Sequence, residues 1–518
     1  MRLKQFFARP LAWLFCSALL AALPLTFPSL FLLSWVAFAP FFLTLLRDGG
    51  QGTLRSAIGR GVFFGFSYNA LVYYWFLWLY PLDFAGLDNV ASVGVVLLAW
   101  LGISLLHGSL FAIPTVLCHF VGKKSNSRAF LLFTAILGIL LAEWIPTLSQ
   151  LAFPWIRVSL GLYKVPAMIQ LASVFGIYGV DFLLLAFSAL LALAIASQRK
   201  KQSFALCLSA LLLFTANLGF GLIRLSNSEE ERTITVSSVQ GCVLSGEKWS
   251  GRGALSTYVS LTREAPESDL ILWPESAVPV NLATNSELLA EFQLLSEELD
   301  VPMMMGCFWK IEGQTSNSVV LLDKDTVSDV YSKRHLVPFG ERMPYRPILS
   351  RIVPVLEEIN MLSSDLAQGE GSVVIESEWG GLGSIVCFES LFPSLTRRSV
   401  KDGAELIVLV TNDSWYEDSP AVWQHLAHAV FRSVENSRST VRCANSGVSA
   451  FIDSRGRLQS ILGPLQKGIL TDTVSFSEET TLYTTWGDVF LPALVALWLL
   501  SAGLVLHWER RGKHARQK

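Results

Sequence analysis

Charged residues are scarce in this 518-residue chain. They make up only 16% of it, and hydrophobic residues make up 52%, whereas about a quarter of the residues in a soluble protein are charged. This composition excludes a wholly soluble or disordered protein. The formal net charge is −2, and no Lys/Arg tract adjoins an aromatic-rich polar surface. Binding to nucleic acid therefore has no support.

Cysteine is also rare, with seven residues and no CxxC pair. This argues against a disulfide scaffold and against a structural zinc site. Cys242, Cys307 and Cys443 could still pair in an oxidising compartment, and the sequence leaves that open. We expect no metal and no organic cofactor.

Long uncharged runs take the place of the missing charge. No charged residue occurs between Arg9 and Arg47, and Pro24 and Pro28 lie near the middle of that run, where a helix would break. A cleavable signal peptide is disfavoured, because no small-residue cleavage site is followed by a polar start. We predict eight membrane-spanning helices, at about 10–26, 28–46, 61–80, 90–120, 129–145, 177–198, 203–223 and 489–508.

The distribution of Lys and Arg supports this arrangement, because basic residues in short loops stay on the cytoplasmic side. Basic clusters flank alternate spans, whereas the opposite loops, 24–28 and 80–89, contain no Lys or Arg. The pattern predicts that both termini are cytoplasmic and that the long segment between the last two spans lies outside. The expected division is 1–223 for seven helices, 224–487 for the outer domain, and 488–518 for the last helix and a basic tail.

The outer segment has a different pattern. Apolar, β-rich runs such as Thr233 to Gln240 and Leu406 to Thr411 alternate with helix-capable stretches such as 285–299 and 419–437. A segment of about 250 residues can bury its own core. We predict one α/β domain.

Three ionisable residues interrupt the apolar spans. Glu143 and Asp181 fall toward the outer ends of their spans, where they could reach the membrane interface, and His107 stands alone in a helix. An ionisable residue in a span is by default a functional candidate. For these three we favour a structural role, with His107 as a hydrogen-bonded packing residue.

Three apolar runs of the outer domain each end at a reactive side chain. Ile271 to Pro274 precedes Glu275, Val330 to Ser332 precedes Lys333, and Ser384 to Val386 precedes Cys387.

In an α/β sheet such strand ends converge at one edge. A thiol nucleophile needs a base, and an acyl-transfer transition state needs positive charge near its oxyanion. Together the three side chains supply the parts of an acyl-transfer site.

Histidines offer a weaker alternative. His425 and His428 have the spacing of one helix face, and His335 lies two residues from Lys333. No carboxylate or third histidine nearby in the sequence completes a zinc pattern, so we disfavour both a metal site and a Cys-His nucleophile.

Four ordered motifs carry a resemblance to a known family. They are Leu272-Trp273-Pro274-Glu275-Ser276-Ala277, Tyr331-Ser332-Lys333-Arg334-His335-Leu336-Val337-Pro338-Phe339-Gly340-Glu341, Cys387-Phe388-Glu389, and Thr411-Asn412-Asp413-Ser414-Trp415. These segments resemble the nitrilase superfamily, and with eight spans around them the chain resembles, over essentially its whole length, the bacterial apolipoprotein N-acyltransferases.

The resemblance implies a membrane helical bundle in the bacterial inner membrane and a periplasmic nitrilase-like domain with an α-β-β-α sandwich fold. It implies transfer of a fatty acyl chain from a phospholipid to the α-amino group of a lipoprotein's diacylglyceryl-modified N-terminal cysteine. The family's Glu-Lys-Cys triad maps onto Glu275, Lys333 and Cys387, with a second glutamate at Glu341. We expect a monomer.

The roles follow from this mapping and from the chemistry. Glu275 takes the Cys387 proton, and the thiolate attacks the phospholipid ester to form a thioester. Lys333, with the backbone N–H of Phe388, stabilises the oxyanion. Lysophospholipid leaves, and Glu275 then deprotonates the incoming amine, which gives ping-pong kinetics.

Five further residues receive supporting roles. We expect Glu341 and Glu389 to orient Lys333 and Cys387, with ordinary surface acids as the alternative. Trp415 and Trp249 either line the acyl or headgroup pocket or pack in the core. Asn412 belongs to the fourth motif and is expected to support the site.

Other features mark departures and alternatives. Phe388 stands where the family has Tyr, and Pro146 stands where it has a basic residue after Trp144.

The apolar segment Met343 to Leu366 is either a lid toward the bilayer or an ordinary packed loop. The rival functions are a membrane-tethered nitrilase-like amidase and a transporter or scaffold with an inactive outer domain.

Overall fold

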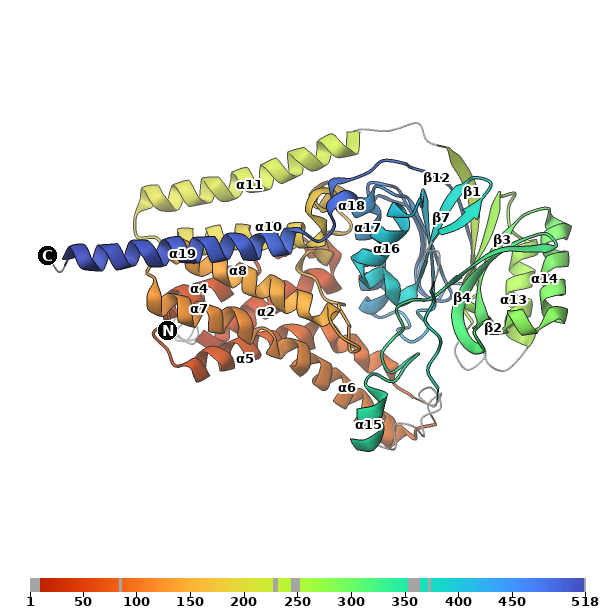
Figure 1. The fold of residues 1–518 in the computed structure, drawn as a ribbon, viewed down its shortest axis with the longest axis horizontal. Coiled ribbons are helices and arrows are strands. Elements are labelled where there is room, and N and C mark those ends of the chain that lie inside the picture. The colour runs from red at the N-terminus through yellow and green to blue at the C-terminus, as the bar shows by residue number, and fades with distance from the viewer. Residues whose placement is uncertain are drawn as a thin grey trace.

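The computed structural model describes residues 10–82, 86–226, 232–243, 252–352, 364–370 and 374–516. The molecule is elongated: a bundle of apolar helices forms one end, and a part with two β-sheets forms the other (Figure 1). Both chain ends lie at the helical end of the molecule (Figure 1).

Apolar helices precede the sheets, and one follows them. They are α2 (Pro10–Thr26), α3 (Leu33–Val36), α4 (Ala39–Asp48), α5 (Leu54–Val72), α6 (Asn89–Ser109), α7 (Ala112–Lys124), α8 (Arg128–Trp144), α9 (Pro166–Ile169), α10 (Ala172–Ala196), α11 (Lys200–Ser226) and α19 (Phe490–Arg516).

Several of these helical stretches are long and apolar enough to cross a membrane: Leu54–Leu79, Asn89–Lys124, Arg128–Thr147, Ala172–Ala196 and Lys200–Ser226. Shorter apolar helices cover Pro10–Thr26 and Phe490–Val505. The chain therefore has the helices of a membrane protein, whereas the count of eight spans stays a prediction.

Prolines explain where the helices differ from the expected spans. The stretch 28–46 is not one helix, because a 3-10 turn (Pro28–Leu30), α3 and α4 divide it. Pro24 lies inside α2 rather than at its end. The stretch 90–120 divides into α6 and α7, because Pro114 fits the first turn of a new helix but would clash with the carbonyl of Leu110 in a continuous one.

The other end of the molecule contains two six-stranded sheets. The first has the order β12-β1-β2-β3-β4-β5 and the second β11-β10-β9-β8-β7-β6. The strands are β1 (Thr233–Gln240), β2 (Leu270–Asn281), β3 (Met303–Ile311), β4 (Gln314–Asp323), β5 (Thr326–Ser332), β6 (Val374–Ser377), β7 (Gly380–Val386), β8 (Leu406–Thr411), β9 (Thr440–Ala444), β10 (Ser449–Ile452), β11 (Leu458–Leu462) and β12 (Gly468–Ser475).

The two sheets pack face to face between helices (Figure 1). Helices α13 (Arg252–Arg263) and α14 (Ser286–Leu299) cover the first sheet, and α16 (Pro393–Lys401) and α17 (Pro420–Asn436) cover the second. Strand β8 is buried along its whole length, as expected for a parallel strand covered on both faces. These layers form the α-β-β-α sandwich that the resemblance predicted.

Helix α17 also joins the sandwich to the helical bundle. Helix α10 breaks at Gly176, where φ is +67°, and a Cβ at this glycine would lie 2.6 Å from the Tyr483 ring. The break exposes the N–H of Ile177, which donates to the Glu435 carboxylate of α17 at 2.9 Å. A carboxylate suits the N-terminus of a helical segment, because the N–H groups there lack partners within the helix.

The ionisable residues of the apolar stretches are buried rather than interfacial. Glu143 accepts a hydrogen bond from the N–H of Val158, and Asp181 accepts one from the N–H of Ser159. These contacts agree with the structural role that we favoured, because both carboxylates are buried and bond the 3-10 turn Val158–Leu162 between α8 and α9 rather than reaching a surface. His107 bonds the Tyr73 hydroxyl at 2.9 Å, which agrees with its predicted packing role.

Candidate active site

The sandwich brings the three predicted reactive residues together from three strands. Glu275 lies in β2, where pairing with β3 is interrupted between Trp273 and Val278. Gly306 of β3 faces this interruption, and a Cβ there would lie 2.4 Å from the carbonyl oxygen of Pro274. Only glycine allows β3 to approach so closely, and the resulting bend turns Glu275 inward.

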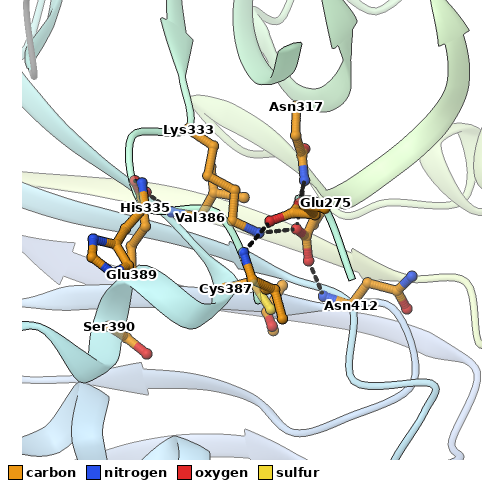
Figure 2. Close-up of polar contacts among 12 residues, drawn as sticks. Glu275, Asn317, Lys333, His335, Val386, Cys387, Glu389, Ser390 and Asn412 are labelled. Atoms are coloured by element: carbon orange, nitrogen blue, oxygen red, sulfur yellow. Dashed lines mark hydrogen bonds and ion pairs between the residues drawn. The ribbon is translucent and has the colours of Figure 1, made fainter. Parts of the chain in front are cut away.

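Glu275 is the centre of a hydrogen-bond network (Figure 2). Its Oε1 accepts from Lys333 Nζ at 2.9 Å and from Asn317 Nδ2 at 2.7 Å, and its Oε2 accepts from the backbone N–H of Asn412 at 2.8 Å. Lys333 follows β5 directly, and Asn412 follows β8. The network therefore joins the first sheet to the second.

Lys333 also bonds a second carboxylate, that of Glu341. Its Nζ donates to Glu341 Oε1 at 2.9 Å, and Glu341 Oε2 accepts from the N–H of Val337 at 2.9 Å. The ammonium group is buried, which alone would lower its pKa, but the charges of Glu275 and Glu341 outweigh burial and hold the pKa of Lys333 above its ordinary value. The two carboxylates therefore favour the protonated, positively charged form of the lysine.

Cys387 begins a short 3-10 turn (Cys387–Leu391) at the end of β7. Its φ of +54° lies in the left-handed region, which is costly for a residue with a side chain and is common at functional turns. Burial raises the pKa of the Cys387 thiol, the Glu275 carboxylate raises it further, and Lys333 opposes both. The resting group is a neutral thiol that needs a base.

Glu389 connects two strand ends through backbone groups. Its Oε1 accepts from the N–H groups of Arg334 and His335 at 2.6 and 3.1 Å, and its Oε2 accepts from the N–H of Val386 at 2.8 Å and from the Tyr331 hydroxyl at 2.9 Å. Glu389 thus fixes the backbone on both sides of the lysine and the strand that leads to the thiol.

The sequence shows no carboxylate that would complete a metal pattern with His425, but the fold brings one next to it. Asp413, at the end of β8, meets His425 of α17, and ligand atoms of Asp413, His425 and Cys387 lie within 4.8 Å of one another. The Arg442 guanidinium also bonds Asp413 at 2.7 Å and reaches His425 at 3.2 Å. A positive charge therefore already occupies this group, which makes it a poor cation site.

His425 bonds the nucleophile's backbone. Its Nδ1 lies 2.9 Å from Asp413 Oδ1, and its Nε2 lies 3.1 Å from the carbonyl oxygen of Cys387 and 3.0 Å from the Ser390 hydroxyl. His428 instead contacts the carbonyl of Trp155. The two histidines thus share a helix but not a role.

Aromatic residues from the apolar helical part of the chain pack against Phe388, which follows Cys387 directly, and against Tyr416, which follows the fourth motif. The Phe388 ring stacks on Phe153 with ring centroids 5.6 Å apart, and Tyr416 meets Trp75 at 5.0 Å and Trp155 at 5.5 Å. Phe388 is therefore a packing residue that links the nucleophile turn to the segment between α8 and α9.

Other expected residues are less informative. Trp415 is half-buried, and Trp249 lies outside the described residues. Cys307 and Cys443 are buried thiols that form no disulfide.

The segment Met343 to Leu366 contains helix α15 (Arg346–Ile352), which exposes two isoleucines, Ile348 and Ile352. Residues 353–363 lie outside the described residues, so the lid stays a prediction.

Sequence reasoning missed three residues around the site, which are Tyr416, Asn317, bonded to Glu275, and Arg442, bonded to Asp413. Asn317 is a polar residue inside a strand, and the only local signal is the unusual run Ser316-Asn317-Ser318, which is buried throughout. Tyr416 follows the fourth motif directly but carries no signal of its own. Arg442 lies in a strand that reads as an ordinary buried run.

A buried carboxylate, a charged amine and a thiol at the strand ends of a sandwich can support acyl transfer through a thioester, either to water or to an amine. A family model for carbon-nitrogen hydrolases matches residues 235–482, which includes all three groups. A model for the apolipoprotein N-acyltransferase N-terminal domain matches residues 17–191.

The chain is similar to curated proteins over most of its length. It is 30% identical to an apolipoprotein N-acyltransferase of Allorhizobium ampelinum, with 89% of each chain covered. It is 29% identical to one of Geobacter metallireducens, with 93% of this chain and 92% of that one covered. A carbon-nitrogen hydrolase structure from Helicobacter pylori is 17% identical, covering 50% of this chain and 94% of that one, with a TM-score of 0.37. Two family models in series and relatives of matching length show that the chain belongs to the apolipoprotein N-acyltransferase family.

Proposed function

We propose that this protein transfers a fatty acyl chain from a phospholipid to the α-amino group of the diacylglyceryl-modified N-terminal cysteine of lipoproteins. Family membership supports N-acylation. The observation that carries the choice of donor is the contact between Phe388 and Phe153, through which the nucleophile turn packs on the segment between α8 and α9 in the apolar helical part of the chain. A thiol in that position suits an acyl donor that arrives from the bilayer.

The first half-reaction forms an acyl-enzyme. Glu275 takes the proton of the Cys387 thiol, and the sulfur attacks the ester carbonyl of the phospholipid. The oxyanion is stabilised by the Lys333 ammonium and by the backbone N–H of Phe388. The C–O bond then breaks, the proton passes from Glu275 to the departing oxygen, and lysophospholipid leaves a thioester on Cys387.

The second half-reaction uses the same groups in reverse. The α-amine of the lipoprotein enters, Glu275 accepts its proton, and the nitrogen attacks the thioester carbonyl. The C–S bond breaks, the sulfur recovers a proton, and the product is an amide. Lys333 keeps its charge throughout, because Glu275 and Glu341 flank it.

The proposed setting is the bacterial inner membrane. We place eight spans in it, both termini in the cytoplasm and the sandwich in the periplasm, with the protein acting as a monomer. The alternation of basic loops supports this orientation. Lipoproteins and phospholipid headgroups would both reach the site from the periplasmic side.

The test is transfer to a synthetic peptide with an N-terminal diacylglyceryl-cysteine, incubated with the purified protein in phospholipid micelles. We expect amide-linked fatty acid on the peptide, detected by mass spectrometry, and none on the same peptide with an acetylated α-amine. Turnover of simple soluble amides without transfer to the peptide would favour the rival function, a membrane-tethered nitrilase-like amidase.

A further inference from the structure

Asn317 lies in β4 between the two glutamates of the site. The residue is 3% exposed, and its single NH₂ group donates to Glu275 Oε1 at 2.7 Å (Figure 2). The same NH₂ group donates to Glu341 Oε1 at 2.8 Å. Its backbone carbonyl accepts the N–H of Lys333 at 2.8 Å. One residue therefore contacts both carboxylates and the lysine's main chain.

The carboxylates of Glu275 and Glu341 repel each other, and Asn317 lies where it can reduce this repulsion. Glu275 and Glu341 each place Oε1 2.9 Å from the same Lys333 Nζ. Two negative charges share one positive charge, so the three groups carry a net negative charge in a buried place. Like charges at such separations favour protonation of one partner. Two N–H donors aimed at the two oxygens offset this repulsion.

The orientation of the amide follows from its surroundings. If the amide were reversed, its oxygen would face two carboxylate oxygens, which is repulsive. Asn317 Oδ1 is buried and has no hydrogen-bond partner among the described residues. The amide therefore leaves its oxygen without a hydrogen bond while both N–H donors bind the glutamates. Because a buried acceptor without a partner is costly, the two bonds to the glutamates are the contribution of this side chain.

We propose that Asn317 is a positioning residue that holds Glu275 and Glu341 on Lys333 and favours the carboxylate form of Glu275, so that Glu275 is available as the base at the working pH. This inference rests on the acyl transfer proposed above. Among the described residues, the charged and titratable groups around Glu275 include Lys333, Cys387, Tyr416 and, across the lysine, Glu341. Lys333 is the positive charge among them.

The test is the pH dependence of acyl-enzyme formation in Asn317→Leu and Asn317→Asp. Leucine fills the space but donates no hydrogen bond, and aspartate adds a third carboxylate beside one lysine. For both variants we expect the acid limb of the rate profile to move to higher pH, by roughly one unit for leucine and further for aspartate. The probe is a defined phosphatidylethanolamine in micelles, with the acyl mass increment on the intact protein as the readout.

Ser318→Ala is the matched control. It removes a buried hydrogen bond of the same strand, between the Ser318 and Ser332 hydroxyls, without touching either glutamate. We expect its acid limb to coincide with that of the wild type, even where its rate is lower.

Two outcomes separate this inference from the function on which it rests. A wild-type protein that forms no acyl-enzyme contradicts the proposed function. The second outcome is that the wild type forms the acyl-enzyme, and the Asn317 variants react more slowly but keep the acid limb at the wild-type pH. That result contradicts the positioning role and leaves Asn317 only a structural one. Should Asn317→Leu fail to fold, the aspartate variant, which is nearly isosteric, decides the question.

Discussion

At the scale of single residues, two opposite charges act on the Cys387 thiol. Burial and the Glu275 carboxylate raise its pKa, and Lys333 lowers it. The thiolate is the species that reacts with alkylating agents, so below the pKa the alkylation rate at a fixed pH falls tenfold for each unit by which the pKa rises. Alkylation and acylation therefore respond differently to the loss of Glu275.

We predict that Glu275→Gln speeds alkylation of Cys387 by iodoacetamide while it abolishes acylation. Removing the carboxylate lowers the thiol pKa, so the rate at pH 8 should rise roughly threefold to tenfold, whereas Lys333→Met should slow it. Intact mass measured against time gives both rates. Glu376→Gln, on an exposed site of β6, is the control, and slower alkylation in Glu275→Gln would contradict the assigned charges.

At the scale of elements, Glu389 ties the end of β5 to the end of β7. Its two oxygens accept four hydrogen bonds, three of them from backbone N–H groups. Burial raises its pKa, and the N–H groups of Val386 and Arg334 oppose that rise. The carboxylate therefore acts through the backbone that carries Lys333 and Cys387.

We predict that Glu389→Ala loses acyl-enzyme formation and is less stable than the wild type by about 2–4 kcal/mol, because it leaves buried donors without an acceptor. Glu389→Gln should retain part of both properties, since one amide oxygen can still accept from the backbone. Thermal unfolding and the acylation rate, measured on the same samples, check this. An alanine variant with full activity would remove Glu389 from the support of the site.

The elements also show what sequence patterns reveal. Strands β1 and β8 coincide with the apolar runs that predicted them, because each is buried along a continuous segment. Glu275, Lys333 and Cys387 were recognisable because each follows a local run of this kind. Asn317 was not, because its partners lie 42 and 24 residues away. His425 was undervalued for the same reason, because Cys387 is 38 residues distant in the sequence.

At the scale of the whole molecule, the sandwich is joined to the bundle by buried polar contacts as well as by aromatic ones. Glu435 of α17 pairs with Arg432 and accepts the N–H of Ile177 at the break in α10. Burial raises the pKa of Glu435 to about 7, although Arg432 opposes the rise. The joint between the two parts of the molecule is therefore sensitive to pH.

We predict that Glu435→Gln removes a pH-dependent part of the stability. Because the folded pKa is raised, protonated Glu435 contributes stability below its unfolded pKa near 4.5, and that contribution is lost as pH rises through about 7. The wild-type unfolding temperature should fall between pH 5 and pH 8, and the glutamine variant should lose most of that change. Identical pH profiles for the variant and the wild type would contradict this account of the joint.

The central claim is that Cys387 carries the acyl chain of a phospholipid as a thioester. The most direct measurement is intact mass spectrometry of the purified protein in phospholipid micelles, with Cys387→Ala and Cys387→Ser beside the wild type. We predict a fatty-acyl increment on the wild type, removed by hydroxylamine and absent from the alanine variant. A hydroxylamine-sensitive increment on Cys387→Ser, or one that survives in Cys387→Ala, would contradict the claim.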